Sequence, residues 1–116
     1  MRYILLSADH EPTLYEVPDA LAEHLSDWAE AFLENVYAPG SLFRKTAREP
    51  SGKTYAIYCY DEQDFVIWLN QQDITNDQKV QEPESMSPEE RELILKTAEM
   101  ERNYPYEQQQ YPWFNF

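Results

Sequence analysis

The sequence predicts a small α+β domain, and two observations support this class. The chain has 116 residues, of which 42% are hydrophobic and 15% aromatic, so it can bury one substantial core. Short apolar runs typical of strands flank one long stretch with helical periodicity. The predicted architecture is an antiparallel sheet of three to four strands with a long amphipathic helix packed on one face. A C-terminal helix and an aromatic tail are expected to follow.

Two strands are expected near the N-terminus. Residues 2–8 form an apolar run bounded by turn-forming residues, which is typical of a buried strand. Residues 9–13 include Pro12 and indicate a turn. Residues 13–17 place Leu14 and Tyr15 among polar side chains, so we expect them to pair back on the first strand.

The clearest element is a helix that begins at Pro18 and Asp19 and continues to about Val36. At 100° per residue, apolar and acidic side chains fall on opposite faces of it. The apolar face consists of Leu21, Leu25, Trp28, Phe32 and Val36. The acidic face consists of Asp19, Glu23, Asp27, Glu30 and Glu34. This pattern predicts a helix that packs on a sheet through its apolar face.

A β-hairpin is expected from residues 42–47 and 54–60, because turn-forming residues lie between them at 49–52. Residues 54–60 carry apolar side chains on both sides, which indicates a central strand. The hairpin also contains four cations: Arg44, Lys45, Arg48 and Lys53. They are too few for a nucleic-acid site, and we interpret them as a solvated hairpin tip that could pair with another copy's acidic helix.

Residues 61–72 fit either a helix or a further strand. Asp61 can cap a helix that has Phe65, Trp68 and Leu69 on one face, and this capping pattern favours the helix. Residues 73–86 are polar and indicate a linker. The expected organisation is a compact part at 1–72, the linker at 73–86, a helix at 87–104 and an aromatic tail at 105–116, all in one domain.

The C-terminal helix has a strong start signal. Ser87 is the expected N-cap, Pro88 the first helical residue, and Glu90 stands at the third position of a capping box. A narrow apolar stripe runs along the expected helix and consists of Leu93, Thr97, Met100 and Tyr104.

The charge balance excludes several kinds of partner. The chain has 22 acidic and nine basic residues, a formal net charge of −13, which opposes direct binding to nucleic acid or to an anionic membrane. No apolar run approaches the roughly 18 residues that a membrane span needs. Cys59 is the only cysteine, so no intrachain disulfide can form. These features predict a cytoplasmic protein.

No catalytic, cofactor or metal site is predicted. The chain lacks the phosphate-binding, dinucleotide-binding, zinc-protease and serine-hydrolase motifs, and it has only two glycines. His10 and His24 would need several carboxylates to hold zinc. Cys59 falls in an apolar strand, where a buried, inert thiol is the usual case. A small enzyme is therefore only the third hypothesis for function.

The acidic face of the first helix has two interpretations. A solvated face that maintains solubility is the simpler one. However, its carboxylates repeat at i,i+4, and each such like-charge pair destabilises a helix by about 0.2–0.5 kcal/mol. This cost supports a binding surface for a basic protein partner. An acidic rod can also imitate DNA phosphates, so a DNA-mimic inhibitor of a nucleic-acid-binding protein is the alternative hypothesis.

The aromatic tail is the second candidate for partner binding. It contains Tyr111, Trp113, Phe114 and Phe116, stiffened by Pro105 and Pro112. It can cap the domain's own core, remain a free end, or dock on another chain, including a second copy in a homodimer. The predicted function is that of a non-enzymatic acidic protein–protein interaction protein of bacterial or phage type.

Overall fold

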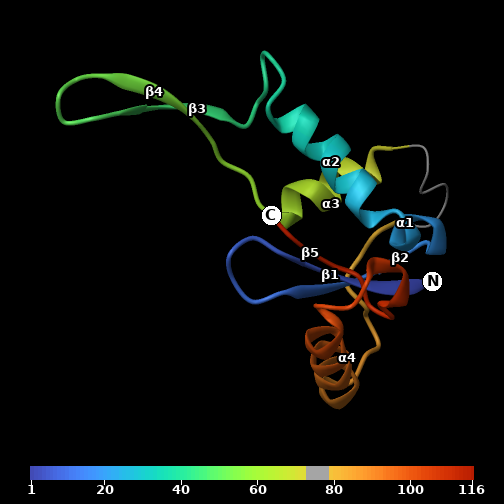
Figure 1. The fold of residues 1–116 in the computed structure, drawn as a ribbon. Helices are drawn as coiled ribbons and strands as arrows, with labels where there is room; N and C mark the ends of the chain where they lie inside the picture. The colour runs from blue at the N-terminus through green and yellow to red at the C-terminus, as the bar shows by residue number, and fades with distance from the viewer. Residues whose placement is uncertain (73–78) are drawn as a thin grey trace.

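Strand β1 (Arg2–Ser7) lies at the centre of the fold (Figure 1). The computed structural model, which describes residues 1–72 and 79–116, places it between β2 (Thr13–Val17) and β5 (Trp113–Asn115). β2 pairs with β1 antiparallel, and β5 pairs with it parallel. The α+β class is confirmed. The prediction of an antiparallel sheet is wrong in one respect, because the third strand comes from the tail and makes the sheet mixed.

The apolar run in β1 is explained by burial on both faces. Ile4 and Leu6 contact the core on one side of the sheet, and Leu5 contacts a second core with Leu14 on the other side. All three β1 side chains are fully buried. A strand covered on both faces has a continuous apolar sequence instead of an alternating one.

The first core is built under two helices, α1 (Asp19–Glu23) and α2 (Leu25–Val36). Leu21, Leu25, Phe32 and Val36 are buried as predicted, whereas Trp28 is only half-buried. The prediction of one continuous helix is wrong, because His24 breaks it with φ −123° and ψ 31°.

The Tyr106 hydroxyl explains where the helix breaks. It accepts a hydrogen bond from the backbone N–H of Leu25 at 2.9 Å and donates one to the carbonyl of Ala22 at 2.6 Å. A side chain inserted into the i→i−4 ladder is a recognised cause of a sharp break in a helix. Tyr106 belongs to a short 3-10 turn, η2 (Tyr106–Gln108), so the tail fixes the end of α1 and the start of α2.

Residues 61–72 contain a helix, α3 (Glu62–Asn70), as the capping pattern indicated. Asp61 accepts a hydrogen bond from the backbone N–H of Asp64, and the Asp64 side chain accepts one from Asp61, both at 3.0 Å. Phe65 and Leu69 are buried in the first core.

The described part of the predicted linker packs against the domain. Val80 is buried, exchanges two hydrogen bonds with the Asn70 side chain, and precedes a bridge between Gln81 and Glu16. This part of the predicted polar linker is therefore held against the domain at Val80 and Gln81. Residues 73–78 of that prediction lie outside the described residues.

Helix α4 (Pro88–Glu101) covers the second face of the sheet (Figure 1). The Ser87 hydroxyl caps it by accepting a hydrogen bond from the N–H of Glu90 at 3.1 Å. Ile94 and Ala98 are buried against the sheet, whereas three members of the predicted stripe, Leu93, Met100 and Tyr104, are at least half exposed. The stripe was misassigned because adjacent apolar residues at 93–95 leave the buried face ambiguous. None of the described helices is both long and apolar enough to span a membrane.

The predicted hairpin forms, but as a separate sheet of two strands, β3 (Arg44–Arg48) and β4 (Thr54–Tyr58). It projects away from the body of the molecule (Figure 1). The radius of gyration is 16.3 Å, well above the roughly 13 Å of a compact domain of similar length. The prediction of a central strand at 54–60 is therefore wrong, since both faces of β4 are largely exposed.

Phe32 is the centre of the first core. Its ring lies 5.4–6.0 Å from the rings of five others: Phe43, Tyr60, Phe65, Trp68 and Phe116. We expect Phe32→Ala to reduce the free energy of unfolding by about 3–5 kcal/mol, because a fully buried ring leaves a cavity. Trp28→Ala should cost less, since its ring is half-buried. Denaturant unfolding of both variants tests this order, and equal losses would contradict it.

Candidate functional site

The five predicted carboxylates of α1 and α2 are all exposed: Asp19, Glu23, Asp27, Glu30 and Glu34. We call them the acidic face. The break at His24 divides these five residues between two helices. Asp27, Glu30 and Glu34 share one side of α2, and Asp19 and Glu23 lie on α1. No lysine or arginine occurs between Arg2 and Arg44, so both helices lack a cationic side chain apart from His24.

Few charges compensate the acidic face. Asp19 pairs with the N-terminal amine at 3.3 Å, and Asp27 pairs with His24 at 3.5 Å. Within residues 1–72 and 79–116, Glu23, Glu30 and Glu34 form no salt bridge. Exposed pairs of this kind are each worth at most about 1 kcal/mol. The face therefore keeps a net negative field that a cationic surface would neutralise.

A shallow hollow lies at the C-terminal end of α2. It has a volume of about 360 Å³ and is lined by Glu30, Leu33, Glu34 and Tyr37. Leu33 and Tyr37 supply apolar surface, and the two glutamates supply negative charge. Such a surface suits a cationic side chain with an apolar neighbour.

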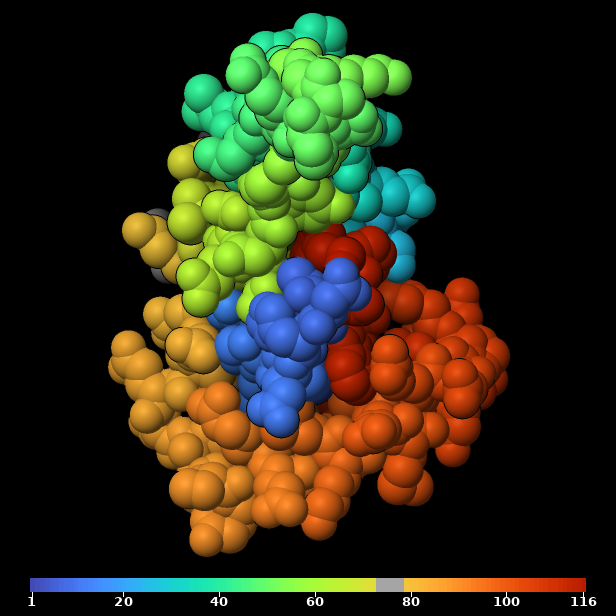
Figure 2. All heavy atoms as spheres, turned by 90° about the vertical axis from the view of Figure 1, so that its left-hand side faces the viewer, coloured from blue at the N-terminus to red at the C-terminus, as the bar shows by residue number. Residues whose placement is uncertain are grey.

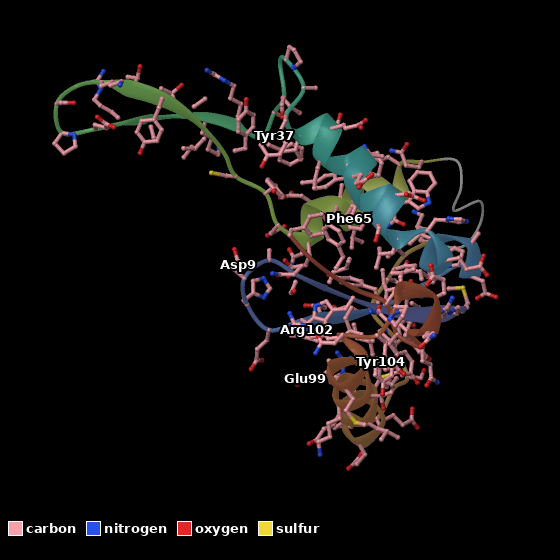
Figure 3. The ribbon with its side chains drawn as sticks, in the orientation of Figure 1. Asp9, Tyr37, Phe65, Glu99, Arg102 and Tyr104 are labelled. Carbon is pink, nitrogen blue, oxygen red and sulfur yellow. The ribbon has the colours of Figure 1, made fainter. Side chains whose placement is uncertain are left out.

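The projecting hairpin is the second unpartnered surface. We call residues 44–58 the arm. Tyr55 is 48% exposed and Ile57 is 37% exposed. Tyr37 lies at the root of the arm (Figure 3), where its ring is 4.7 Å from that of Tyr58. The sequence placed the four cations here but did not indicate that the hairpin leaves the body.

The tail residues lie on the domain's own core. Phe116 packs its ring 5.0 Å from Phe65 and 4.8 Å from Phe114. On the opposite face, the guanidinium of Arg102 lies 4.4 Å from the Trp113 ring centre, and Tyr111 packs on the second core. Figure 2 shows the last residues, in red, filling the space beside the N-terminal turn. Of the alternatives for the tail, the structure shows the one in which it caps its own core.

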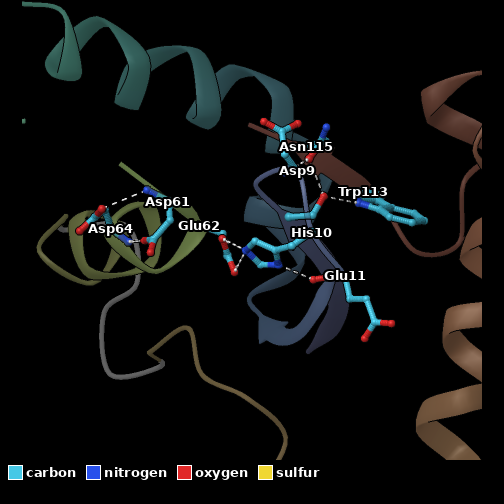
Figure 4. A network of polar contacts seen from close by, with 9 residues as sticks. Asp9, His10, Glu11, Asp61, Glu62, Asp64, Trp113 and Asn115 are labelled. Carbon is cyan, nitrogen blue, oxygen red and sulfur yellow. Dashed lines mark hydrogen bonds and ion pairs between the residues drawn. The ribbon is translucent and has the colours of Figure 1, made fainter. Parts of the chain in front are cut away.

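A polar network fastens the tail to β1 (Figure 4). The Asn115 side-chain oxygen accepts from the Ser7 hydroxyl at 2.8 Å and from the backbone N–H of Asp9 at 3.1 Å. The Trp113 indole donates to Ser7 at 3.1 Å. Asp9 has a positive φ of 61°, a conformation that aspartate tolerates better than most residues. Sequence reasoning missed this network because its partners are separated by more than 100 residues.

His10 joins the turn between β1 and β2 to the start of α3. Its Nε2 lies 3.0 and 3.1 Å from the two carboxylate oxygens of Glu62, and its Nδ1 lies 2.8 Å from the backbone carbonyl of Glu11 (Figure 4). Glu62 is almost fully buried. Both ring nitrogens face acceptors, so the doubly protonated ring is favoured. A carboxylate-rich flank of His10 is visible in the sequence, but its partner on α3 is not.

The pKa of His10 is raised. The largest cause is the carbonyl of Glu11, and the charges of Glu62 and Asp61 add to it, against partial desolvation, which lowers the pKa. The charged ring supports the fold below the ordinary histidine pKa of about 6.5, and this support is lost as pH rises through the higher folded pKa.

We expect the free energy of unfolding of the wild type to fall relative to that of His10→Gln as pH rises from about 6 to about 8. Denaturant unfolding across this range measures the difference. His24→Gln is the matched control, because His24 and its partner Asp27 are both exposed. If the free energy of unfolding of the wild type and of His10→Gln changed in parallel with pH, the stabilising role of the His10–Glu62 pair would be contradicted.

We also expect Phe116→Ala to lower the free energy of unfolding, by somewhat less than the roughly 3–5 kcal/mol lost with a fully buried phenylalanine. The reason is that Phe116 is partly exposed but contacts the rings of Phe32 and Phe65. Thermal unfolding tests it, with Gln108→Ala at an exposed position as the control. An unchanged melting temperature would contradict a tail that stabilises the core.

Cys59 directly follows the arm, at its root, and is exposed, so the prediction of a buried thiol is wrong. The reason is that the hairpin projects instead of lying inside the sheet. His10 pairs with Glu62 and His24 with Asp27, so each histidine is engaged by a carboxylate. Among the described residues, no group of three or more histidine, cysteine or acidic side chains is arranged to hold a metal ion.

Comparison with known proteins gives no assignment. No protein-family model matches the chain, and neither the curated proteins nor the solved structures contain a significant match. Two exposed surfaces, the acidic face and the arm, are the candidates for function.

Proposed function

We propose that the protein is a non-enzymatic interaction protein whose acidic face binds a basic protein surface. The observation that carries the proposal is the exposure of all five carboxylates on helices that lack lysine and arginine. Complementary charge accelerates encounter and selects partners, so this surface suits a cationic partner. A single exposed thiol fits a reducing cytoplasm.

The buried side of α2 holds the helix on the core, so the acidic face is not needed for packing. Leu25, Ala29, Phe32 and Val36 already fix the helix on the core. Glu30 and Glu34 stand at i,i+4 and repel each other, and a bound cationic surface would relieve that repulsion. This separation of a stabilising face from a destabilising face is what a binding helix needs.

A DNA-mimic inhibitor is the second candidate. Asp27, Glu30 and Glu34 lie three and four residues apart on α2, which is about 4.5 and 6 Å along the helix axis. A row of charges at such spacing resembles a phosphate backbone. The arm weighs against this candidate, because a surface that imitates DNA needs no cations and four of the nine basic residues gather in the arm.

The test is charge reversal of the acidic face. We expect Glu23→Lys, Asp27→Lys and Glu30→Lys together to abolish capture of partner proteins from a host lysate by the tagged chain. The reason is that the three residues are exposed and carry the field that attracts a cationic surface. Circular dichroism checks that the fold is retained.

The matched control reverses three exposed carboxylates elsewhere: Glu84→Lys, Glu92→Lys and Glu99→Lys. It changes the net charge equally, so it should leave partner capture intact. Retained binding by the acidic-face variant at low salt would reject both candidates, since screening is weakest there. A captured DNA-binding protein that dissociates in moderate salt would favour the mimic over the general interaction protein.

A further inference from the structure

We propose that a second copy of the chain binds the arm, so that the arm of each copy lies along the acidic face of the other. This inference rests on the proposed function, because it uses the same acidic face and names its partner. It also gives the arm a role that the folded monomer does not supply.

The arm lacks support within one molecule. An isolated two-stranded hairpin is at best marginally stable in water, because it has no third strand or helix to cover its side chains. Tyr55 and Ile57 lie on one face of the arm with Lys45, which pairs across from Ile57. This face is apolar, exposed and positively charged, and a covering surface would stabilise it.

The charges of the arm and of the body are opposite. The arm has four cations and one carboxylate, a net charge of +3, so the remainder of the chain carries −16 of the total of −13. Two bodies repel each other wherever their acidic surfaces meet. The arm is the surface through which a second copy can approach with attraction.

The acidic face matches the arm in size and chemistry. Helix α2 has 12 residues and is about 18 Å long, and a strand of five residues is about 17 Å long. The hollow of Glu30, Leu33, Glu34 and Tyr37 offers apolar surface between two carboxylates. Ile57 and Tyr55 fit the apolar part, and Lys45 fits the carboxylates.

The position of the arm favours exchange between copies. The arm follows α2 in the sequence and projects from the body beyond the end of that helix (Figure 1), so its tip lies where another molecule can reach it. A two-fold arrangement lets each arm reach the other copy and closes the assembly at two chains. Both contacts are then the same, and no charged arm is left over.

The edges of the arm support this docking over strand pairing. β3 contributes Arg44, Lys45 and Arg48 to one edge, and charged side chains on an edge strand oppose pairing with another strand. β4 has no charged residue, so pairing of two β4 edges is the competing arrangement. That arrangement leaves the acidic face uncovered and Lys45, on the face of Tyr55 and Ile57, without an acidic partner.

The experiment uses two full-length variants with opposite charge changes. The arm variant carries Arg44→Glu, Lys45→Glu and Arg48→Glu, and the helix variant carries Asp27→Lys, Glu30→Lys and Glu34→Lys. Light scattering measures the mass of each sample in about 0.1 M salt, where the Debye length is about 10 Å. Salt at this concentration screens the repulsion between the two bodies but not the attraction between charges in close contact. We expect wild type to have twice the monomer mass and each variant alone to have the monomer mass.

An equimolar mixture of the two variants should regain the dimer mass. In a mixed pair, the unchanged arm meets the unchanged helix, and the reversed arm meets the reversed helix, so both contacts are attractive again. Reversal of Glu84, Glu92 and Glu99 to lysine is the control and should leave the dimer intact. Circular dichroism checks that each variant is folded. A restored dimer in the mixture is a second check, because an unfolded variant could not form it.

Several results would overturn the inference, among them a monomeric wild type, a dimer that persists in the arm variant, as β4 pairing predicts, and a mixture that stays monomeric. The proposed function fails separately, because it is measured by capture from a lysate. A monomeric wild type that captures a basic protein through the acidic face would overturn the second-copy assignment and leave the proposed function standing. A dimer that survives in the helix variant would overturn the second-copy assignment in the same way.

Discussion

The fold depends on the two edges of β1. This strand is buried on both faces, so every backbone group along it needs a partner within the protein. β2 follows directly in the sequence and satisfies one edge. The other edge is satisfied by the last residues of the chain, where the N–H of Leu5 donates to the carbonyl of Pro112 at 2.9 Å and the N–H of Phe116 donates to that of Ser7 at 2.8 Å. The C-terminal segment is therefore a structural part of the sheet.

This closure determines the environment of the remaining elements. Once β5 lies beside β1, Phe116 enters the first core and Trp113 covers the second, so one short segment contributes to both layers. The approach to β5 brings Tyr106 to the junction of α1 and α2, where it satisfies the backbone groups at the break. His10 and Asn115 then fix the turn that follows β1 to α3 and to the tail. Each of these contacts joins segments far apart in the sequence.

Local signals predicted the elements, and distant contacts explain the differences. The Asp61 and Ser87 caps, the apolar face of α2 and the turn between β3 and β4 depend on neighbouring residues, so the sequence indicates them. The helix break at His24 depends on Tyr106, and the third strand depends on a pairing of residues 5–7 with 113–115. Apolar patterning also misplaced β4, because exposed Tyr55 and Ile57 resemble core residues. For the candidate site, the sequence identified the acidic face and the cations but not their separation in space.

That separation connects the fold to the proposed function. The tail occupies the free edge of the sheet, and its aromatic side chains at 111–116 pack on the two cores of the same chain. The arm contributes little to either core beyond its root, where Tyr58 packs against the first core, and yet it contains exposed Tyr55 and Ile57 together with four of the nine basic residues. Exposed apolar area is costly in water, and an acidic surface that covered Tyr55 and Ile57 would also neutralise the cations beside them. The two surfaces left without a structural role are complementary to each other in charge, which is the physical basis for the proposed binding.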